Sequence, residues 1–388
     1  MIINTLNFKK SIHVFIFILF VNWVYLDYIS IKWAYFGASS KFSFEGFLVS
    51  LLTSFLAGTP LLKLKKQTTG GFIVLLLYYY TYIPMAVVLS YKCFEKGYDF
   101  AQYLVAICLS FFLFATIGSK NFPLRFRSLE AEIFKKINGL ILFNTLIISV
   151  ILVSLGKDLN FVNPFGEDVY TQRFSARDSV SRTIILDYLI MLSSGVITPL
   201  IFSYGLYSKR IGLVILSVAQ TFILYSIAAN KGYIFSLFLI LMVAKLSQKD
   251  NYDRYFLKFN SLLSLTIVLV GLIFSESILY EAFMAIFGVR FLMISGINSV
   301  NYIEYFITHQ KTYYTHLNIV NYFSNTYPYG DLQIGQVIGD YYYNLADANF
   351  NANFFLTDGV AAAGIFGVVF IGILGGLLMA LINILVSK

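Results

Sequence analysis

Long apolar runs separated by short polar connections make up almost the whole of this chain. Each run has about 17–25 residues, the length that an α-helix needs to cross the roughly 30 Å hydrocarbon core of a bilayer. A backbone within lipid must satisfy its own hydrogen bonds, so the runs predict helices. We expect ten membrane-spanning helices, near residues 12–28, 44–62, 72–91, 101–118, 138–156, 184–206, 211–228, 232–246, 260–278 and 355–385.

The composition agrees with this pattern. Hydrophobic residues make up 58% of the chain and charged residues 12%, whereas soluble domains have about 25% charged residues. The last run is long enough for one tilted helix or two short ones, which gives about 10 helices with a range of roughly 10–12. We predict an all-α, polytopic integral membrane protein with a single transmembrane domain over residues 1–388 and no separate soluble domain.

Lysine and arginine in the connections predict the orientation. Short basic connections such as "LKLKKQ" alternate with less basic ones, and cytoplasmic loops carry the excess of positive charge. Both termini are therefore expected in the cytoplasm, with two long connections, about 157–183 and 279–354, in the periplasm. The net charge of +8 reflects this bias and anionic lipid, because no basic stripe lies on a soluble domain to bind nucleic acid.

The second long connection contains an apolar stretch that we do not count as a span. "ESILYEAFMAIFGVRFLMISG" has helical apolar spacing but is interrupted by charge. Such a pattern favours an amphipathic or re-entrant helix.

Basic residues in the outer connections are candidates for binding phosphate. Arg173 and Arg177 are four residues apart and share one face of a helix. A guanidinium can hold two phosphate oxygens at once. Lys231 lies in a tight connection beside Gly232, and Arg290 stands alone in an apolar run. The alternatives are snorkelling to lipid phosphate for Lys231 and a structural ion pair with Asp340 or Glu281 for Arg290.

The same connections are rich in tyrosine and hold the candidate acid–base residues. Part of the tyrosine, including Tyr313 and Tyr314, is expected to stack on sugar rings, and the rest to mark the membrane interface. His316 and Asp340 are the two candidates for a general base. Neither the two cysteines nor any paired carboxylates have metal-ligand spacing, so we expect no metal and no cofactor.

Four stretches together resemble the oligosaccharide repeat unit polymerases of the Wzy type. They are "VYTQRF", "AANKGYIF", "VRFLMISGINSVNYIEYF" and "YPYGDLQIGQVIGDYYYNLADANFNANFFLTDGVAAAGIFGVV", and they extend from about residue 168 to 376. The resemblance singles out Tyr170, Asn351 and Asn353 as further sugar-binding residues. The chain departs from the family by stopping after the tenth span, where relatives often carry one or two more.

The resemblance implies a multi-helix membrane glycosyltransferase fold in the bacterial inner membrane. Donor and acceptor would both be oligosaccharide repeats on undecaprenyl diphosphate, joined on the periplasmic face into O-antigen or a related polysaccharide, with a chain-length regulator as a possible protein partner. Arg173, Arg177, Lys231 and Arg290 would hold the leaving diphosphate, and Arg173, Arg290, His316 and Asp340 would act in catalysis. The alternatives are an O-antigen ligase of the same fold and a non-enzymatic flippase for the same lipid-linked sugar.

Overall fold

In a computed structural model of the protein, the described residues 5–34, 37, 40–64, 68–120, 136–163, 171–172, 183–247, 252–344 and 350–386 form helices and connections without β-strands. Ten helices are long and apolar enough to cross a membrane. This confirms an all-α, multi-pass membrane protein.

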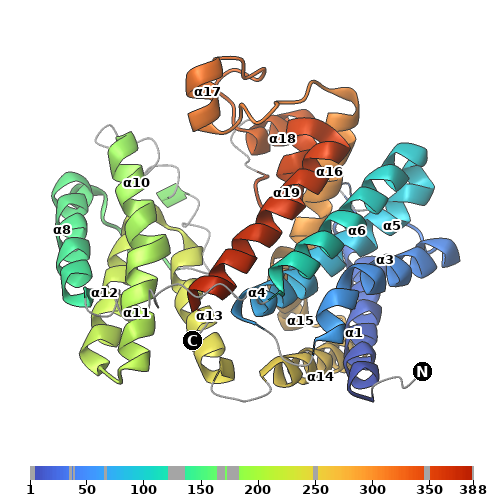
Figure 1. The fold of residues 1–388 in the computed structure, drawn as a ribbon, viewed down its shortest axis with the longest axis horizontal. Helices are drawn as coiled ribbons and strands as arrows, with labels where there is room; N and C mark the ends of the chain where they lie inside the picture. The colour runs from blue at the N-terminus through green and yellow to red at the C-terminus, as the bar shows by residue number, and fades with distance from the viewer. Residues whose placement is uncertain are drawn as a thin grey trace. The chain divides into compact units, whose positions relative to one another are not determined.

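The helices group into two compact units, which we describe separately (Figure 1). Unit 1 consists of residues Met1–Phe126 and Asp253–Lys388, and unit 2 of Arg127–Tyr252. The single domain expected from the sequence stays a prediction. The elements of unit 1 are α1 (Thr5–Trp23), η1 (Val24–Ile29), α2 (Ser30–Lys32), α3 (Phe44–Lys63), α4 (Thr69–Leu77), η3 (Tyr78–Tyr82), α5 (Ile83–Lys96), α6 (Tyr98–Gly118), α14 (Tyr252–Phe274), α15 (Ile278–Met284), η6 (Ala285–Met293), α16 (Ile294–Thr308), α17 (Asn318–Ser324), α18 (Ile334–Tyr343) and α19 (Leu356–Val386).

Unit 2 is built around a buried polar contact between its helices. Asn144 donates to Thr198 Oγ1 and to Gln220 Oε1, each at 3.0 Å, and accepts from Ser193 at 2.8 Å. These bonds connect helices that otherwise pack through isoleucine and leucine. The elements of unit 2 are α8 (Ile137–Leu155), η4 (Gly156–Asp158), α10 (Ile184–Leu192), η5 (Ser193–Ile197), α11 (Thr198–Tyr207), α12 (Ile211–Ala228) and α13 (Lys231–Ser247).

The structure shifts one predicted boundary and changes the set of long apolar helices. The span predicted at 260–278 runs over Tyr252–Phe274, because Asp253 near its start is buried in an ion pair with Lys10 at 2.6 Å. The run predicted at 232–246 corresponds to α13, whose 17 residues are one fewer than in the shortest of the ten. Ile278–Thr308, which starts at the beginning of the connection predicted at 279–354, is counted among the ten in its place.

Two spans of unit 1 run in parallel and define its two sides. The first runs from Phe8 to Lys32 and the second from Thr69 to Lys96. Phe17 packs on Tyr79, with ring centroids 4.6 Å apart, and further along Tyr91 donates to Asn22 at 2.9 Å. We call the side where both spans end the Lys96 side, and the side where both begin the Lys10 side.

The segment Ile278–Thr308 begins and ends on the Lys96 side. Near its start Glu281 pairs with Lys32, and near its end Glu304 pairs with Lys96 at 2.6 Å. Between them, the Phe291 ring lies 5.0 Å from Tyr80, in the middle of the second span. The segment therefore runs through α15 and the π-helical η6 to the level of Tyr80 and returns through α16. From the sequence, an amphipathic or a re-entrant helix is expected here.

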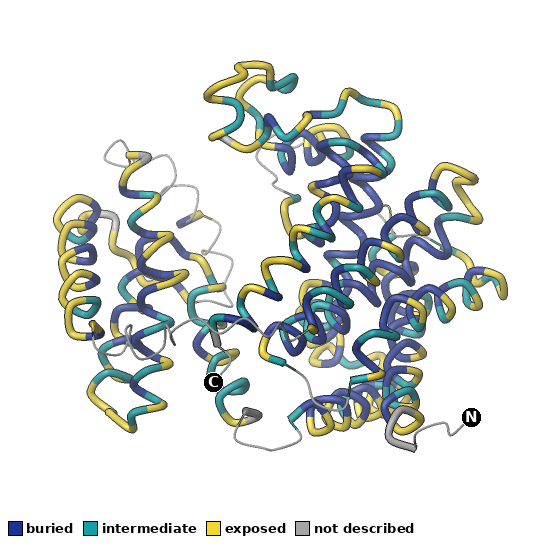
Figure 2. Tube along the Cα trace, in the orientation of Figure 1, coloured by how far each residue is buried: buried dark blue, intermediate teal, exposed yellow. Residues whose placement is uncertain are grey.

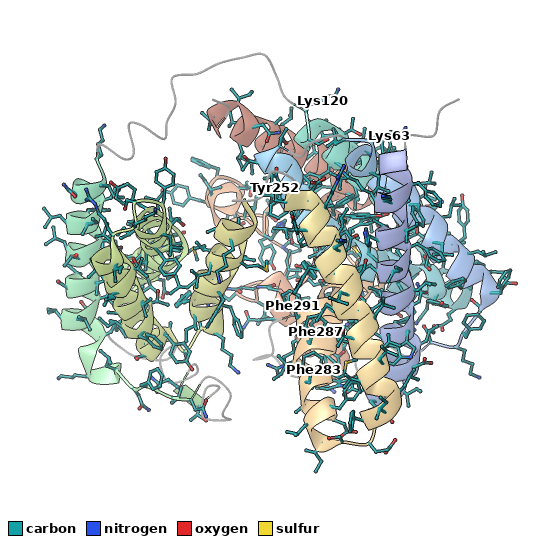
Figure 3. The ribbon with its side chains drawn as sticks, turned by 90° about the horizontal axis from the view of Figure 1, so that it is seen from below. Lys63, Lys120, Tyr252, Phe283, Phe287 and Phe291 are labelled. Atoms are coloured by element: carbon teal, nitrogen blue, oxygen red, sulfur yellow. The ribbon has the colours of Figure 1, made fainter. Side chains whose placement is uncertain are left out.

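Aromatic stacking supports the descending arm of this segment. Phe283, Phe287 and Phe291 stack in a row with 5.5 Å between successive rings. In Figure 3 this row runs alongside α14 in the direction of Tyr252, the first residue of that helix. Lys63 and Lys120 lie at the same end of unit 1 as Tyr252. The returning arm, α16, is buried along most of its length (Figure 2).

The path of the chain supports α13 as a span despite its length. Asn383 accepts from the Gly70 amide at 2.6 Å and donates to the Gly118 carbonyl at 2.8 Å, so α6 and α19 both end on the Lys10 side. Helix α14 begins on that side, through Asp253. An even number of crossings must therefore lie between α6 and α14, and α13 supplies the fourth after α8, α10–α11 and α12.

Single cysteines at the two ends of the re-entrant segment test this path. We expect Glu276→Cys and Gln310→Cys, both at exposed positions, to react with a membrane-impermeant thiol reagent in intact spheroplasts, in a chain that also carries Cys93→Ala and Cys108→Ala. Lys63→Cys, at an exposed position on the Lys10 side, is the control and should react only after lysis. Reaction of only one of the two ends in intact cells would make Ile278–Thr308 a crossing helix. Reaction of Lys63→Cys alone would reverse the orientation.

Candidate functional site

A polar pocket of about 640 Å³ lies in the connection between α16 and α19. This connection follows Glu304 and precedes α19, so it lies on the Lys96 side. The volume is within the range of about 300–1,000 Å³ that is usual for small-molecule sites. The side chains that give the pocket its chemistry are Tyr302, His316, Tyr327, Asp331, Asn351, Asn353 and Asp358.

A break in helix α19 anchors the loop that carries His316. Ala363 and Gly364 are non-helical, and Gly364 has a φ of +63°, which favours glycine. Next to the break, the carbonyls of Ala361 and Ala362 accept hydrogen bonds from the amides of Thr312 and Tyr313, each at 2.9 Å. The loop thus pairs with the helix at the point where the helix cannot complete its own ladder.

His316 is held by a side chain of the same loop. Its Nδ1 lies 2.8 Å from Thr312 Oγ1, which is also 3.3 Å from the Ala361 carbonyl oxygen. Burial lowers the pKa of His316 below the usual value of 6.5. At neutral pH the ring is therefore uncharged and able to accept a proton.

Asn298 of α16 fixes the wall that carries Asn351 and Asn353. Its Nδ2 donates to the carbonyl oxygen of Ala352 at 3.0 Å and approaches that of Phe350 at 3.5 Å. One turn further along α16, the Tyr302 hydroxyl donates to Asn351 Oδ1 at 3.3 Å. The two pocket amides are thus placed by a buried helix, as a preorganised binding site requires.

The phenols around the pocket are neutral hydrogen-bonding groups. Burial raises the pKa of Tyr327 to about 12, and raises the pKa values of Tyr314 and Tyr329 above the ordinary value. Tyr327 donates to the Leu332 carbonyl at 2.8 Å. A neutral phenol beside amide side chains is well suited to sugar rings and hydroxyls.

The structure brings together only some of the residues selected from the sequence. His316, Asn351 and Asn353 line one pocket. Tyr314 lies beside it, with its ring 6.2 Å from that of His316, whereas Tyr313 is exposed. Asp331 and Asp358 also line the pocket, although nothing in their sequence spacing distinguishes them from other outer carboxylates.

Other selected residues lie elsewhere. Asp340 is exposed on α18, whose buried face is formed by Ile334, Val337 and Ile338. Arg290 is in η6, at the bend of the re-entrant segment and about 18 Å of helix rise from Tyr302. Lys231 begins α13 in unit 2.

Much of the connection predicted at 157–183 lies outside the described residues. Tyr170, Arg173 and Arg177 lie outside the described residues. Among the residues that the structure does describe, no group of three or more His, Cys, Asp or Glu side chains is arranged to hold a metal ion.

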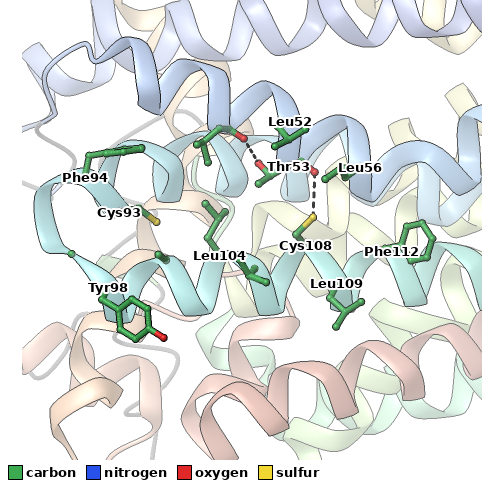
Figure 4. A pocket seen from close by; sticks show the side chains of 14 residues that line it. Leu52, Thr53, Leu56, Cys93, Phe94, Tyr98, Leu104, Cys108, Leu109 and Phe112 are labelled. Atoms are coloured by element: carbon green, nitrogen blue, oxygen red, sulfur yellow. Dashed lines mark hydrogen bonds between the residues drawn. The ribbon is translucent and has the colours of Figure 1, made fainter.

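An apolar groove of about 730 Å³ runs between α3, α5 and α6 (Figure 4). Its lining includes Leu52, Leu56, Cys93, Leu109 and Phe112. The polar contacts drawn in Figure 4 are internal to the protein: Thr53 donates to the Val49 carbonyl at 2.8 Å, and Cys108 Sγ lies 3.5 Å from the Thr53 carbonyl. The groove is suited to hydrocarbon and offers nothing for sugar recognition.

No protein-family description, curated protein sequence or solved structure matches the chain. The function must therefore be inferred from the residues and their geometry.

Replacing Asn298 should damage the pocket wall. We expect Asn298→Ala to lower the free energy of unfolding by about 1–3 kcal/mol, because the Ala352 carbonyl loses its buried donor. Thermal unfolding in detergent is the measurement. Ser299→Ala is the matched control, since the Ser299 hydroxyl donates to the Ser295 carbonyl of its own helix. Equal melting temperatures for the two variants would contradict the role of Asn298.

Proposed function

We propose that the protein joins oligosaccharide repeat units carried on a polyprenyl diphosphate, on the periplasmic face of a bacterial inner membrane. The observation that carries this proposal is the polar pocket on the Lys96 side. In it meet His316, selected from the sequence as a base, and Asn351 and Asn353, selected as sugar ligands. The Wzy-type resemblance of the sequence and the proposed glycosyltransferase-like fold point to the same reaction.

The proposed reaction needs one proton acceptor at the acceptor sugar. A hydroxyl oxygen of the acceptor forms a bond to the anomeric carbon of the donor, and the bond from that carbon to the diphosphate oxygen breaks. The diphosphate leaves with the bonding electrons, and the hydroxyl proton passes to His316. Because the pKa of His316 lies below its usual value, the ring is in the basic form at neutral pH.

The diphosphate requires positive charge, and the proposed ligands are Arg173, Arg177, Lys231 and Arg290. Fixed donors at a developing negative charge lower the barrier most in sites that exclude water. Arg290 lies about 18 Å of helix rise from Tyr302. It contacts the same substrate only if that substrate reaches from the pocket to the bend of the re-entrant segment.

The pocket favours chemistry on one face over simple transport. A flippase must expose its polar path to both faces in turn, whereas these polar side chains gather on the Lys96 side. An O-antigen ligase would use the same donor and a different acceptor. The product therefore distinguishes the two enzymes: a polymerase forms a ladder from lipid-linked repeats alone, and a ligase needs the lipid A core.

Removing the proposed base should abolish most of the turnover. With purified protein and lipid-linked repeat, we expect His316→Gln to lower kcat by about 10²–10⁴-fold, the usual contribution of a general base. The wild-type rate should rise with pH up to the pKa of His316, below 6.5, and then level off, because only the neutral ring accepts a proton. His309→Gln is the matched control, since His309 stacks on Tyr305 outside the pocket. Wild-type turnover in His316→Gln would remove His316 from the mechanism.

The diphosphate ligands can be tested by keeping the charge and removing the forked geometry. We expect Arg173→Lys and Arg290→Lys each to lower turnover by about 10²–10³-fold, the usual loss for one donor to a developing charge. Polymer ladders from cells that express equal amounts of each variant provide the measurement. Wild-type ladders from both variants would show that these arginines are structural.

A further inference from the structure

The hydrogen bond between His316 and Thr312 has a direction that can be inferred from the contact of Thr312 with α19. In an unbroken helix the Ala361 carbonyl would accept from the amide four residues ahead, but non-helical Ala363 and Gly364 interrupt that ladder. Thr312 takes over this carbonyl with its amide at 2.9 Å and its hydroxyl at 3.3 Å. A carbonyl oxygen has two lone pairs and accepts both bonds.

A threonine hydroxyl has only one proton to donate. When Thr312 gives that proton to the Ala361 carbonyl, its oxygen is left as an acceptor toward His316 Nδ1, 2.8 Å away. His316 Nδ1 must then carry a proton and donate it to Thr312. In the neutral ring the other nitrogen, Nε2, is consequently unprotonated and is the one that accepts a proton.

We propose that Thr312 is a positioning residue that holds His316 in the Nδ1–H tautomer through the break in α19, leaving Nε2 as the base of the pocket. This inference rests on the proposed function for its catalytic meaning, while the tautomer itself is a property of the folded protein. The role resembles that of any group that fixes a histidine tautomer by accepting from the opposite ring nitrogen.

Other charged or titratable groups face the same pocket and must be considered in any pH profile. Those that line it are Asp358 from α19, Asp331 and Tyr327 from the connection after α17, and Tyr302 from α16. Tyr314, whose ring lies 6.2 Å from that of His316, and Lys311 are on the loop of His316 itself. In the part of the chain that the structure describes, the group within hydrogen-bond distance of the His316 ring is the Thr312 hydroxyl. Thr312 is therefore the residue to vary.

The measurement is the ¹⁵N spectrum of the histidine side chains in the full-length protein. The chain has three histidines, so His13→Gln and His309→Gln assign the signals. Above the pKa of His316, the expected wild-type spectrum shows a protonated Nδ1 and an unprotonated Nε2. Thr312→Ser, which retains the hydroxyl, should preserve this tautomer. Thr312→Val, of nearly the same shape but without the hydroxyl, should shift the ring toward the Nε2–H form.

Activity provides the second measurement. We expect Thr312→Val to lower kcat by about 10–100-fold with little change in KM, as for other groups that orient a functional histidine, and Thr312→Ser to restore most of it. Thr308→Val is the matched control, because Thr308 Oγ1 makes the same kind of contact to His309 Nδ1, at 3.0 Å, outside the pocket.

Two results would overturn the proposal. A wild-type His316 with its proton on Nε2 would mean that Thr312 donates to the ring instead of accepting from it. An unchanged tautomer and pH profile in Thr312→Val would mean that Thr312 does not position the ring. If the Thr312→Val chain fails to fold, the spectra of the wild-type protein and of Thr312→Ser decide the question. If the wild-type protein transfers no sugar, the proposed function fails while the tautomer result still stands.

Discussion

The hydrocarbon core contains no water, so every backbone N–H and C=O at membrane depth must find its partner within the protein. Most helices of this chain meet that requirement by their own ladders. The exceptions are informative: α19 is broken at Ala363 and Gly364, and the loop before α17 supplies the missing donors to the Ala361 and Ala362 carbonyls. The loop that carries His316 is therefore held in place by the same requirement that governs the spanning helices.

The re-entrant segment meets the requirement in a different way. It bends through the π-helical η6 without leaving the helical path, and then presents α16 as a buried support for the pocket wall. Irregular backbone inside a membrane is tolerated where it is enclosed by protein or lines a cavity. In this protein the break in α19 and the return of the segment through α16 both support the walls of one pocket.

Much of this architecture was predictable from apolar run length, because that length reports directly on bilayer thickness. For the segment Ile278–Thr308 the sequence predicts an amphipathic or re-entrant helix, since Glu281 and Arg290 interrupt its apolar pattern. The start of α14 was not predictable, because Asp253 looks like a loop residue until Lys10, 243 positions away, neutralises it. The spans could be predicted from the apolar runs themselves, whereas the position of a polar helix end, such as the start of α14, depends on a partner far away in the sequence.

For the candidate site, the sequence allows the kinds of side chain to be predicted, but not which of them lie together in the fold. His316, Asn351 and Asn353 have side chains suited to proton transfer and sugar binding, and they meet in one pocket. Asp340 has equally suitable chemistry, but α18 places it on the face opposite to its buried residues. Thr312 and Asn298 could not have been selected, because they act on backbone carbonyls 49 and 54 residues away, a relation that no local pattern records.

The ion pair between Lys10 and Asp253 also sets an order for biosynthesis. Both side chains are buried, at 4% and 7% exposure, and they join the first span to α14, which comes after unit 2 in the sequence. A buried charge without its partner is strongly destabilising. While the ribosome is still synthesising unit 2, Lys10 has the Leu64 carbonyl as a partner but no carboxylate, and unit 1 closes only after α14 has been inserted.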